Sequence, residues 1–226
     1  MKKSLFVLSG LLAAGLASAQ TVIYANAVGG DHYALPTTSV PLAGAPGWGY
    51  TNIRSNSTIG INTDYAQSGN GSVSFSLQDG NGKADIEYYN TSGRDYVSMG
   101  RLDELSALSY DWYRAAGGTA ENRLSPAMRL LFDADGDFGT TTDRGYLIYE
   151  EVYNTPGARP VDQWVTSDVL SGNVWQRRFS PGKTYTKYDL TIADWANGAS
   201  YEDSLDLTNA AIYGLSMGIG SGWNGT

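Results

Sequence analysis

The sequence predicts an all-β protein, an antiparallel β-sandwich of the jelly-roll type, and three observations carry this prediction. Short runs of alternating apolar and polar residues recur along the 226-residue chain, bounded by Gly, Asn, Asp and Ser. Helical periodicity is scarce. The chain also holds 16 Tyr and 6 Trp, which favour pleated, half-buried surfaces. Strands at such spacing, with glycine-rich connections, are typical of sandwiches in which two antiparallel sheets pack face to face.

The first 19 residues are predicted to be a signal peptide. Lys2 and Lys3 give a positive start, the apolar stretch Leu5–Leu16 follows, and Ala17–Ala19 forms the small-residue pattern of a cleavage site before Gln20. The short Lys-Lys leader is typical of bacteria, so we expect export to the extracellular space or the cell envelope of a bacterium. No later run approaches the ~18 apolar residues of a membrane span, and we expect no membrane-embedded segment.

The remaining residues, 20–226, are predicted to form a single β-sandwich domain, concanavalin-like or carbohydrate-binding-module-like. The first ~50 of them are rich in Pro and small residues and allow no firm assignment beyond one strand. The segment Thr191–Leu207 allows at most a short turn of helix. Predicted strands cover Thr21–Ala27, Ser72–Leu77, Ala84–Tyr89, Ser106–Arg114, Ala127–Asp133, Gly145–Tyr153, Trp164–Asp168, Thr186–Leu190 and Ala211–Ile219.

Charge and cysteine content limit the partners. The formal net charge is −8, and it becomes −10 without the two lysines of the leader. Such a surface repels nucleic acid and anionic lipid, whereas cations and neutral glycans remain compatible. The chain has no cysteine, so an exported protein of this kind depends on packing, hydrogen bonds or a bound ion rather than on disulfides.

The acidic stretch "FDADGDFGTTTDRG" is the candidate metal site. Asp133, Asp135 and Asp137 alternate between two apolar runs, and Asp143 follows near the return of the chain. Curled in a loop, these four carboxylates are candidate ligands of a structural calcium ion, which prefers six to eight oxygens. The alternative is an acidic hairpin tip, since Asp and Gly are good turn residues. Both interpretations remain open.

The same stretch does not match an EF-hand. Phe138 stands at the sixth position, where that loop needs Gly, and Arg144 stands at the twelfth, where it needs a bidentate Glu. No helices are predicted on either side. Any calcium site here must therefore have another geometry.

Support for enzymatic chemistry is weak. Glu150 and Glu151 are adjacent in a predicted strand and point to opposite faces, so they cannot act together on one glycosidic bond. The acids of "YEDSLD" have the wrong spacing for such a pair. With His32 as the only histidine and no cysteine, triads and zinc sites have little support. We therefore expect a non-enzymatic protein.

Tryptophans supply a second set of candidate residues. Trp48 in "GAPGWGY" and Trp223 in "GSGWNG" lie in glycine-rich stretches, where an exposed indole can contact a sugar ring or a protein partner, or else seal an end of the sandwich. Trp112, Trp164 and Trp175 lie in strand-like runs and are expected in the core. The alternation also places Tyr110 on the core face, next to Trp112.

Four stretches carry a family resemblance: "LSALSYDWYRAAGG", "SPAMRLLFDADGDFGTTTDRGYLIYE", "WVTSDV" and "GLSMGIGSGWNGT". Through these stretches the chain resembles exported bacterial β-sandwich proteins of the PEP-CTERM-associated, surface-sorted type. The resemblance covers about half of the chain, from Leu105 to the end. The resemblance implies a sandwich fold at the cell surface and no established activity. The resembling proteins continue into a last strand and a sorting segment, whereas this chain stops at Thr226. We therefore expect a truncated chain or a last strand supplied in trans, with Thr21–Ala27 at an open edge.

Together these observations predict a secreted or cell-surface, non-enzymatic β-sandwich protein that binds glycan or surface proteins, with calcium as its only candidate cofactor. The alternatives are a glycan-active jelly-roll hydrolase and a structural surface-layer component. A pair of acids facing one cleft would favour the hydrolase. Self-association would favour the structural component. The oligomeric state is left open by the sequence.

Overall fold

The computed structural model describes residues 21–34, 36–185 and 187–220. The structure is mostly β: 39% is strand, and the two α-helices found in these residues are short. The mostly β composition agrees with the prediction from sequence. Within the described residues, the helical segments are η1 (Leu102–Glu104), α1 (Glu151–Asn154) and α2 (Ile192–Ala196). None of these helices has the length and hydrophobicity that crossing a membrane requires.

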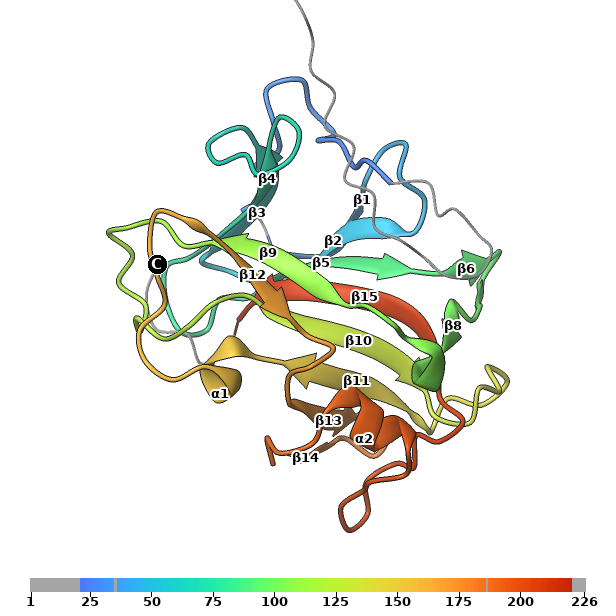
Figure 1. Cartoon of the computed structure of the whole chain (residues 1–226). Coiled ribbons are helices and arrows are strands. Elements are labelled where there is room, and N and C mark those ends of the chain that lie inside the picture. The colour runs from blue at the N-terminus through green and yellow to red at the C-terminus, as the bar shows by residue number, and fades with distance from the viewer. Residues whose placement is uncertain (1–20, 35, 186, 221–226) are drawn as a thin grey trace, which may run out of the picture.

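A large antiparallel sheet forms the centre of the molecule (Figure 1). Within the described residues it has nine strands, in the order β1-β2-β5-β15-β10-β11-β13-β14, and β8 pairs with β15 outside this path. Its strands are β1 (Thr37–Pro41), β2 (Trp48–Ile53), β5 (Ala84–Tyr89), β8 (Gly100–Arg101), β10 (Ala127–Asp133), β11 (Arg144–Tyr149), β13 (Val174–Arg178), β14 (Lys183–Tyr185) and β15 (Ala211–Ile219).

The last described strand, β15, lies in the middle of this sheet. It pairs with β10 on one side and with β5 on the other. Glycines allow the close approach: a Cβ on Gly214 would lie 2.5 Å from the carbonyl oxygen of Tyr88, and one on Gly218 would lie 2.5 Å from that of Ala84. The centre of the sheet is therefore built from segments far apart in the sequence.

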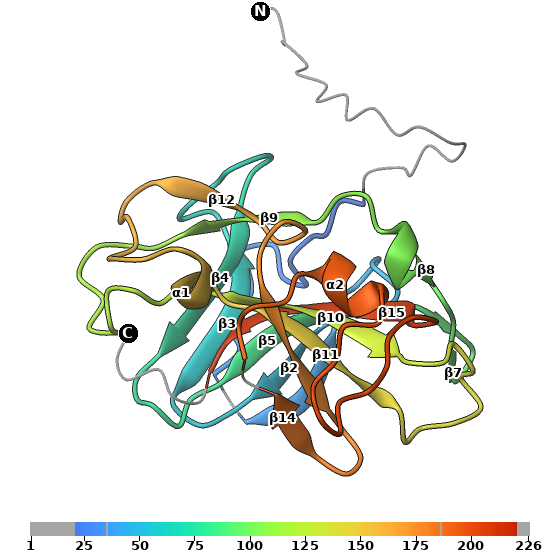
Figure 2. The same cartoon turned by 60° about the horizontal axis from the view of Figure 1, so that its bottom comes forward.

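The remaining described strands form three separate antiparallel pairs. They are β3 (Ser57–Asn62) with β4 (Ser72–Leu77), β9 (Ser109–Tyr113) with β12 (Trp164–Asp168), and β6 (Thr91–Ser92) with β7 (Asp95–Tyr96). The view in Figure 2 and the packing contacts show that β3–β4 and β9–β12 cover the same face of the large sheet. We call it the covered face, and the other the open face.

Two apolar clusters lie beneath these two pairs. The larger cluster fills the space between β9–β12, α2 and the strands β10, β11, β13 and β15; Trp112, Phe132 and Trp195 are among its members. The smaller cluster fills the space between β3–β4 and the strands β2 and β5, around Tyr50 and Ile59. Met217 of β15 is half-buried and packs against both clusters. The core of the covered face is thus divided into two parts that meet at β15.

Several predicted strands coincide with observed ones in both type and bounds. These are the predictions for Ser72–Leu77, Ala84–Tyr89, Ala127–Asp133, Trp164–Asp168 and Ala211–Ile219. In β9 the alternation also holds, because Tyr110 and Trp112 are buried whereas Ser109 and Asp111 are exposed. Alternation thus located β9, whereas β15 is an apolar run that is buried on both faces.

Other predicted elements were wrong. Residues 21–27 form no strand, because the N–H groups of Asn26 and Ala27 donate to the carboxylate of Asp31 instead of to a neighbouring strand. Residues 187–190 are not a strand either. The strand predicted for Gly145–Tyr153 ends at Tyr149, and α1 follows. In the Pro-rich N-terminal part, β1, β2 and β3 were not predicted.

The short helical turn expected after residue 190 is present as α2. The hydroxyl of Thr191 accepts from the N–H of Asp194, and the Asp194 carboxylate accepts from the N–H of Thr191, which makes a capping box. The helix buries Ile192 and Trp195 against the larger cluster. It ends before Gly198, whose φ of +87° is left-handed.

Candidate functional site

The acidic stretch is the tip of a β-hairpin. The strands β10 and β11 pair in register from Met128 opposite Tyr149 to Asp133 opposite Arg144, and residues 134–143 connect them. Residues that lie opposite each other in the two strands point to the same face of the sheet: Leu130 and Leu147 face the core, and Arg129 and Ile148 face the other side. The tip is also held to the end of the strands by a bond from the Ala134 N–H to the Asp143 carbonyl.

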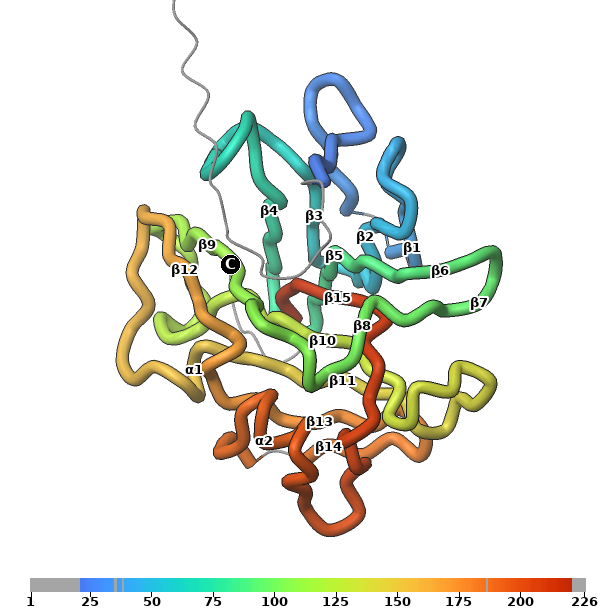
Figure 3. Tube along the Cα trace, turned by 45° about the vertical axis from the view of Figure 1, so that its right-hand side comes forward, coloured from blue at the N-terminus to red at the C-terminus, as the bar shows by residue number. Residues whose placement is uncertain are grey.

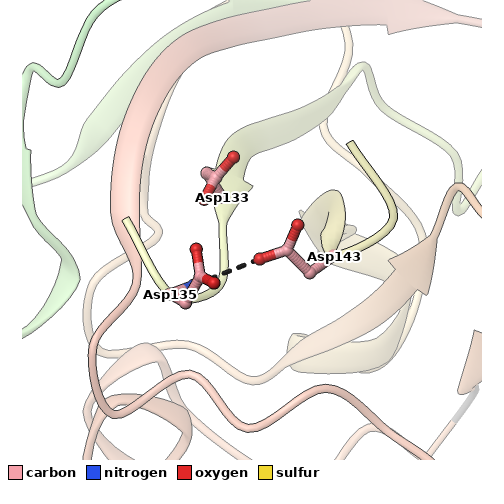
Figure 4. A group of neighbouring side chains, drawn as sticks. All are labelled: Asp133, Asp135 and Asp143. Carbon is pink, nitrogen blue, oxygen red and sulfur yellow. Dashed lines mark hydrogen bonds between the residues drawn. The ribbon is translucent and has the colours of Figure 1, made fainter. Parts of the chain in front are cut away.

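Three of the four predicted metal ligands come together at this tip. Carboxylate oxygens of Asp133, Asp135 and Asp143 all lie within 4.8 Å of one another (Figure 4). Asp143 links the two sides of the loop, because one of its oxygens accepts from the N–H of Asp135 at 3.4 Å and the other from the hydroxyl of Thr140 at 2.8 Å. These bonds preorganise the loop and leave lone pairs on every carboxylate.

Asp133 is the unusual member of this group, which we call the aspartate cluster (Asp133, Asp135 and Asp143). Its side chain is fully buried, with 0% exposure. One oxygen accepts from Nε of Arg144 at 2.9 Å. The other, Oδ1, is buried and has no hydrogen-bond partner among the described residues. A buried carboxylate oxygen without a partner is costly, so this atom is a natural position for a cation.

The protonation of Asp133 reflects the same environment. Burial raises the pKa of Asp133, the nearby Asp143 carboxylate raises it further, and the hydrogen bond from Arg144 opposes both. The Arg144 guanidinium also donates to the carbonyl of Phe138 and lies over the rings of Tyr96, Phe138 and Tyr213, at 5.2–5.8 Å from their centroids. Arg144 is therefore held by the loop and its aromatic neighbours, and in this position it bonds to only one oxygen of Asp133.

Asp137, the fourth predicted ligand, lies outside the aspartate cluster. One of its carboxylate oxygens accepts from the N–H of Gly139 at 3.0 Å, and its own N–H donates to Asp135 Oδ1 at 2.8 Å. Two such bonds in succession are the side-chain turns that Asp forms in loops. The tip thus combines turn chemistry at Asp135 and Asp137 with a convergence of carboxylates at Asp133, Asp135 and Asp143.

The predicted ligand-contact tryptophans have different positions. Trp48 is half-buried at the start of β2, where it packs against the smaller cluster and its ring centroid lies 5.2 Å from that of Tyr88. Trp223 lies outside the described residues. Of the three tryptophans expected in the core, Trp112 is buried, but Trp164 and Trp175 are half-exposed.

Trp164 lines a groove that the sequence did not reveal. This apolar groove has a volume of about 510 Å³ and lies on the covered face, between β4 and β9. Near one end the ring of Tyr65 stacks on that of Tyr113 at 4.3 Å, and the Tyr113 ring contacts Trp164 at 5.6 Å. Met217 lies among its lining residues, where the two clusters meet.

A second, polar groove of about 560 Å³ lies on the open face. Trp175 and Arg177 reach it because they alternate along β13 with the buried Val174 and Gln176. The same alternation in β10 sends Arg129 there. This alternation in the sequence could have predicted that Trp175 lies on the open face rather than in the core.

Charged side chains line the polar groove. Five basic residues contribute: Arg54, Lys83, Arg123, Arg129 and Arg177. Lys83 and Arg129 pair with Asp85, and Arg123 pairs with Glu121. Arg54 and Arg177 form no ion pair within the part of the chain that the structure describes. The groove is thus locally positive in a protein with a net charge of −8.

One acid in the polar groove, Glu150, has a raised pKa. Burial raises the pKa of Glu150, while a hydrogen bond from Nε1 of Trp175 at 2.8 Å and the charge of Arg129 oppose the shift. The neighbouring residue Glu151 points the other way and is buried beside Arg159. The predicted opposite orientation of these two glutamates is present in the structure.

Comparisons of the whole chain with protein families, with curated proteins and with solved structures found no match.

Proposed function

We propose that this is an exported, non-enzymatic binding protein of the bacterial surface whose hairpin tip binds a structural calcium ion. The observation that carries the proposal is the unpartnered, fully buried Oδ1 of Asp133 beside the carboxylates of Asp135 and Asp143. The signal-peptide pattern of residues 1–19 supports export. The two pairs packed on a large sheet support a sandwich of the jelly-roll type.

Calcium fits the aspartate cluster better than other metals. All the side-chain ligands are hard carboxylate oxygens on a loop, which suits the flexible coordination of calcium. Magnesium demands a near-ideal octahedron, and zinc and copper prefer His or Cys ligands. The chain contains one His and no Cys. Three carboxylates leave positions for backbone carbonyls and water, as is usual at calcium sites.

The expected consequence of calcium is added stability. The ion removes the cost of the buried, unpartnered oxygen and offsets the repulsion between Asp133 and Asp143. Because a preformed cluster exists only in the folded chain, binding free energy adds to folding free energy. At a free calcium concentration about 100 times Kd, the gain is about 2.7 kcal/mol.

The test is calorimetric titration with calcium chloride together with thermal unfolding in calcium and in chelator. We expect one site and a rise in Tm that Asp135→Asn and Asp143→Asn abolish. Asp137→Asn is the matched control, because it changes the same loop outside the cluster and should retain the calcium response. No binding at about 10 mM calcium, an order of magnitude above the weak extracellular range, would refute the calcium site.

The polar groove supports a second candidate function, the binding of an acidic glycan. Trp175 lines this groove together with the two cations without ion pairs in the described residues, Arg54 and Arg177. Aromatic rings stack on sugars, and guanidinium groups bind carboxylates in bidentate fashion. We expect oligomers of uronic acids to bind more tightly than neutral glucose oligomers. Arg177→Ala should weaken uronate binding at least tenfold, whereas the exposed Arg94→Ala outside the groove should not.

Hydrolysis of the glycan is the enzymatic alternative, and it requires two free carboxyl groups about 5–10 Å apart. Glu150 lines the polar groove and Asp85 lies beside it. Asp85 is fully buried and bonded to Lys83, Arg129 and the amide of Asn52. These contacts favour a structural role for Asp85, which supports the non-enzymatic proposal. Release of reducing ends that Glu150→Gln abolishes would contradict it.

A further inference from the structure

The apolar groove separates two open strand edges. In Figure 3, β4 and β9 are the inner strands of their pairs, with β3 and β12 on the outside. Each inner strand has a partner on one side only within the described chain. Both strands line the groove. Backbone N–H and carbonyl groups on the unpaired sides of β4 and β9 therefore point into the groove.

The hydrogen bonds of β3 fix the orientation of β4. The N–H and carbonyl of Ile59 bond to Tyr33, on the side of β3 away from β4. In an antiparallel pair, residues alternate between those whose backbone groups bond to the partner and those whose groups point outward. Because Phe75 lies opposite Ile59, its backbone groups point away from β3. Those of Val73 and Leu77 do the same, and all three face the groove.

The hydrogen bonds of β12 fix the orientation of β9 in the same way. The carbonyl of Leu108 accepts from the N–H of Val169, and that of Arg114 accepts from the N–H of Asp162. Even-numbered residues of β9 therefore bond toward the β12 side, and the backbone groups of Ser109, Asp111 and Tyr113 point to the opposite edge. No hydrogen bond involves the outward N–H groups of Phe75, Asp111 or Tyr113 in the described residues.

The floor between these edges is apolar and belongs to the divided core. Met217 and Ile219 of β15 line the groove from below, and Phe75 and Trp112 line it from the sides. Met217 is the point where the two clusters meet, and it is only half-buried. A side chain placed over Met217 would join the two clusters into one core.

We propose that the apolar groove binds an extended polypeptide strand of a partner protein, with apolar residues at alternate positions. The strand pairs with β4 on one side and with β9 on the other, its apolar side chains cover Met217, and its remaining side chains face solvent. Main-chain bonds at both edges supply affinity, and the floor supplies selectivity for alternation. A glycan lacks the regular N–H and carbonyl ladder that two open edges require.

Selection of peptides tests this proposal. The probe is a phage-displayed library of ten-residue peptides with apolar residues at alternate positions, compared with a library of the same composition without alternation. We expect enrichment from the alternating library only. The best peptide, made synthetically, should protect the amides of Phe75 and Asp111 from hydrogen exchange. Its counterpart with N-methyl groups on alternate amides should lose at least tenfold in affinity.

A matched pair of variants separates backbone pairing from side-chain contact. Asp111→Pro removes the outward N–H of an edge strand, a position where proline is tolerated, and should weaken the peptide at least tenfold. Asp111→Ala loses the same carboxylate and keeps the N–H, so it should bind the peptide as the unaltered protein does. Should the proline variant fail to fold, the N-methyl peptide and the exchange measurement decide alone.

Several results would overturn the proposal. Equal enrichment from both libraries or no enrichment would do so, as would protection of amides away from β4 and β9. Protection of the Phe75 and Asp111 amides in the isolated monomer would show a groove already filled. If the same amides become protected only on dimerisation, the occupant is a second copy of this chain rather than a partner strand. Protection by glucose or uronate oligomers would replace the peptide by a glycan.

Discussion

At the scale of single residues, Asp133 shows how one sequence position serves two purposes. It ends the core strand β10, where its backbone pairs with Arg144, and it also begins the acidic tip. Burial raises its pKa, so in the absence of a cation the ionised form costs free energy in the folded state. Calcium requires that same ionised form, so protons and calcium compete for Asp133.

The first prediction concerns this competition. A folded-state pKa above the unfolded value means that the folded chain holds the proton more tightly, so calcium-free stability falls as pH rises above about 4. Calcium affinity should change in the opposite direction and weaken as pH falls from 7 toward 5. Titrations at several pH values measure this change. Asp137→Asn should keep the same dependence, and a pH-independent affinity would contradict the assignment of Asp133 as a ligand.

The second prediction concerns the buried Glu151. Its carboxylate accepts from the hydroxyls of Ser167 at 2.6 Å, Tyr149 at 2.7 Å and Thr155, and it lies 3.3 Å from Nη1 of Arg159. Burial alone would raise its pKa, but these hydrogen bonds and the arginine lower it. Removing one partner of such a buried pair leaves the other uncompensated. Glu151→Gln should therefore reduce the free energy of unfolding by about 3 kcal/mol at pH 7.

The sign of the Glu151 effect with pH is opposite to that of Asp133. A lowered folded-state pKa gives stability that is present above the unfolded value near 4.5 and is lost as pH falls through the folded value. Urea unfolding of both proteins at pH 7 and at pH 3 measures the difference. We expect the difference in free energy of unfolding between the unaltered protein and Glu151→Gln to be smaller at pH 3 than at pH 7. A difference that does not change with pH would contradict an ionised Glu151.

At the scale of elements, alternation of apolar and polar residues located several strands of the large sheet and of the pairs that cover it, although it missed β13, whose residues also alternate between buried and partly exposed. β10 is an example of a strand that it located, because Met128 and Leu130 face the core while Arg129 faces the polar groove. The same alternation gave β9, whereas β15 is buried on both faces and was located by its apolar run. The sequence pattern failed at Thr21–Ala27, where the pattern is apolar but the backbone bonds go to the carboxylate of Asp31, a contact that spacing alone does not reveal.

The aspartate cluster shows a similar division. Alternation of Asp133, Asp135 and Asp137 pointed to a hairpin tip, and the tip is present. The choice of three ligands among the four acids depends on the fold of the loop. Asp137 turns to cap Gly139, and Asp143 returns to the cluster through Thr140. These bonds link nearby residues, but several turn types satisfy the same spacing, so the sequence could not select one.

A third prediction concerns the close packing of β15 against β5. A Cβ on Gly218 would lie 2.0 Å from an oxygen of Asp85 and 2.5 Å from the carbonyl of Ala84. Gly218→Ala should therefore shift the strand or the Asp85 ion pairs and lower the free energy of unfolding by at least about 2 kcal/mol. Gly29→Ala is the control, because nothing lies within 4 Å of its Cβ and no positive φ constrains it. Chemical unfolding of both variants measures the contrast.

At the scale of the whole molecule, the sheet order lies beyond what local patterns predict. β15 lies between β5 and β10, and β2 pairs with β5 although two strands separate them in sequence. Loops allow many such orders, and only the fit of side chains in three dimensions selects one. The polar groove and the position of Met217 beneath the apolar groove follow from this order, so neither could be read from the sequence.

The fourth prediction concerns self-association. Two open strand edges favour pairing with another chain, and like charges on neighbouring molecules oppose it. With a net charge of −8 at pH 7 and a pI near 4.5, repulsion weakens as the solution becomes more acidic. We expect a monomer at pH 7.5 in moderate salt and growing association as pH falls toward 5. Light scattering after size exclusion measures both states, and an unchanged mass would contradict this balance.

The two open edges of β4 and β9 also carry a mechanical consequence for the proposed complex with an extended strand. A strand held between them is bonded along both sides, so a pull along its axis loads all of those hydrogen bonds at the same time. A pull across the axis would instead open them one after another. The proposed complex should therefore dissociate more slowly under a pull along the strand axis than under a pull across it.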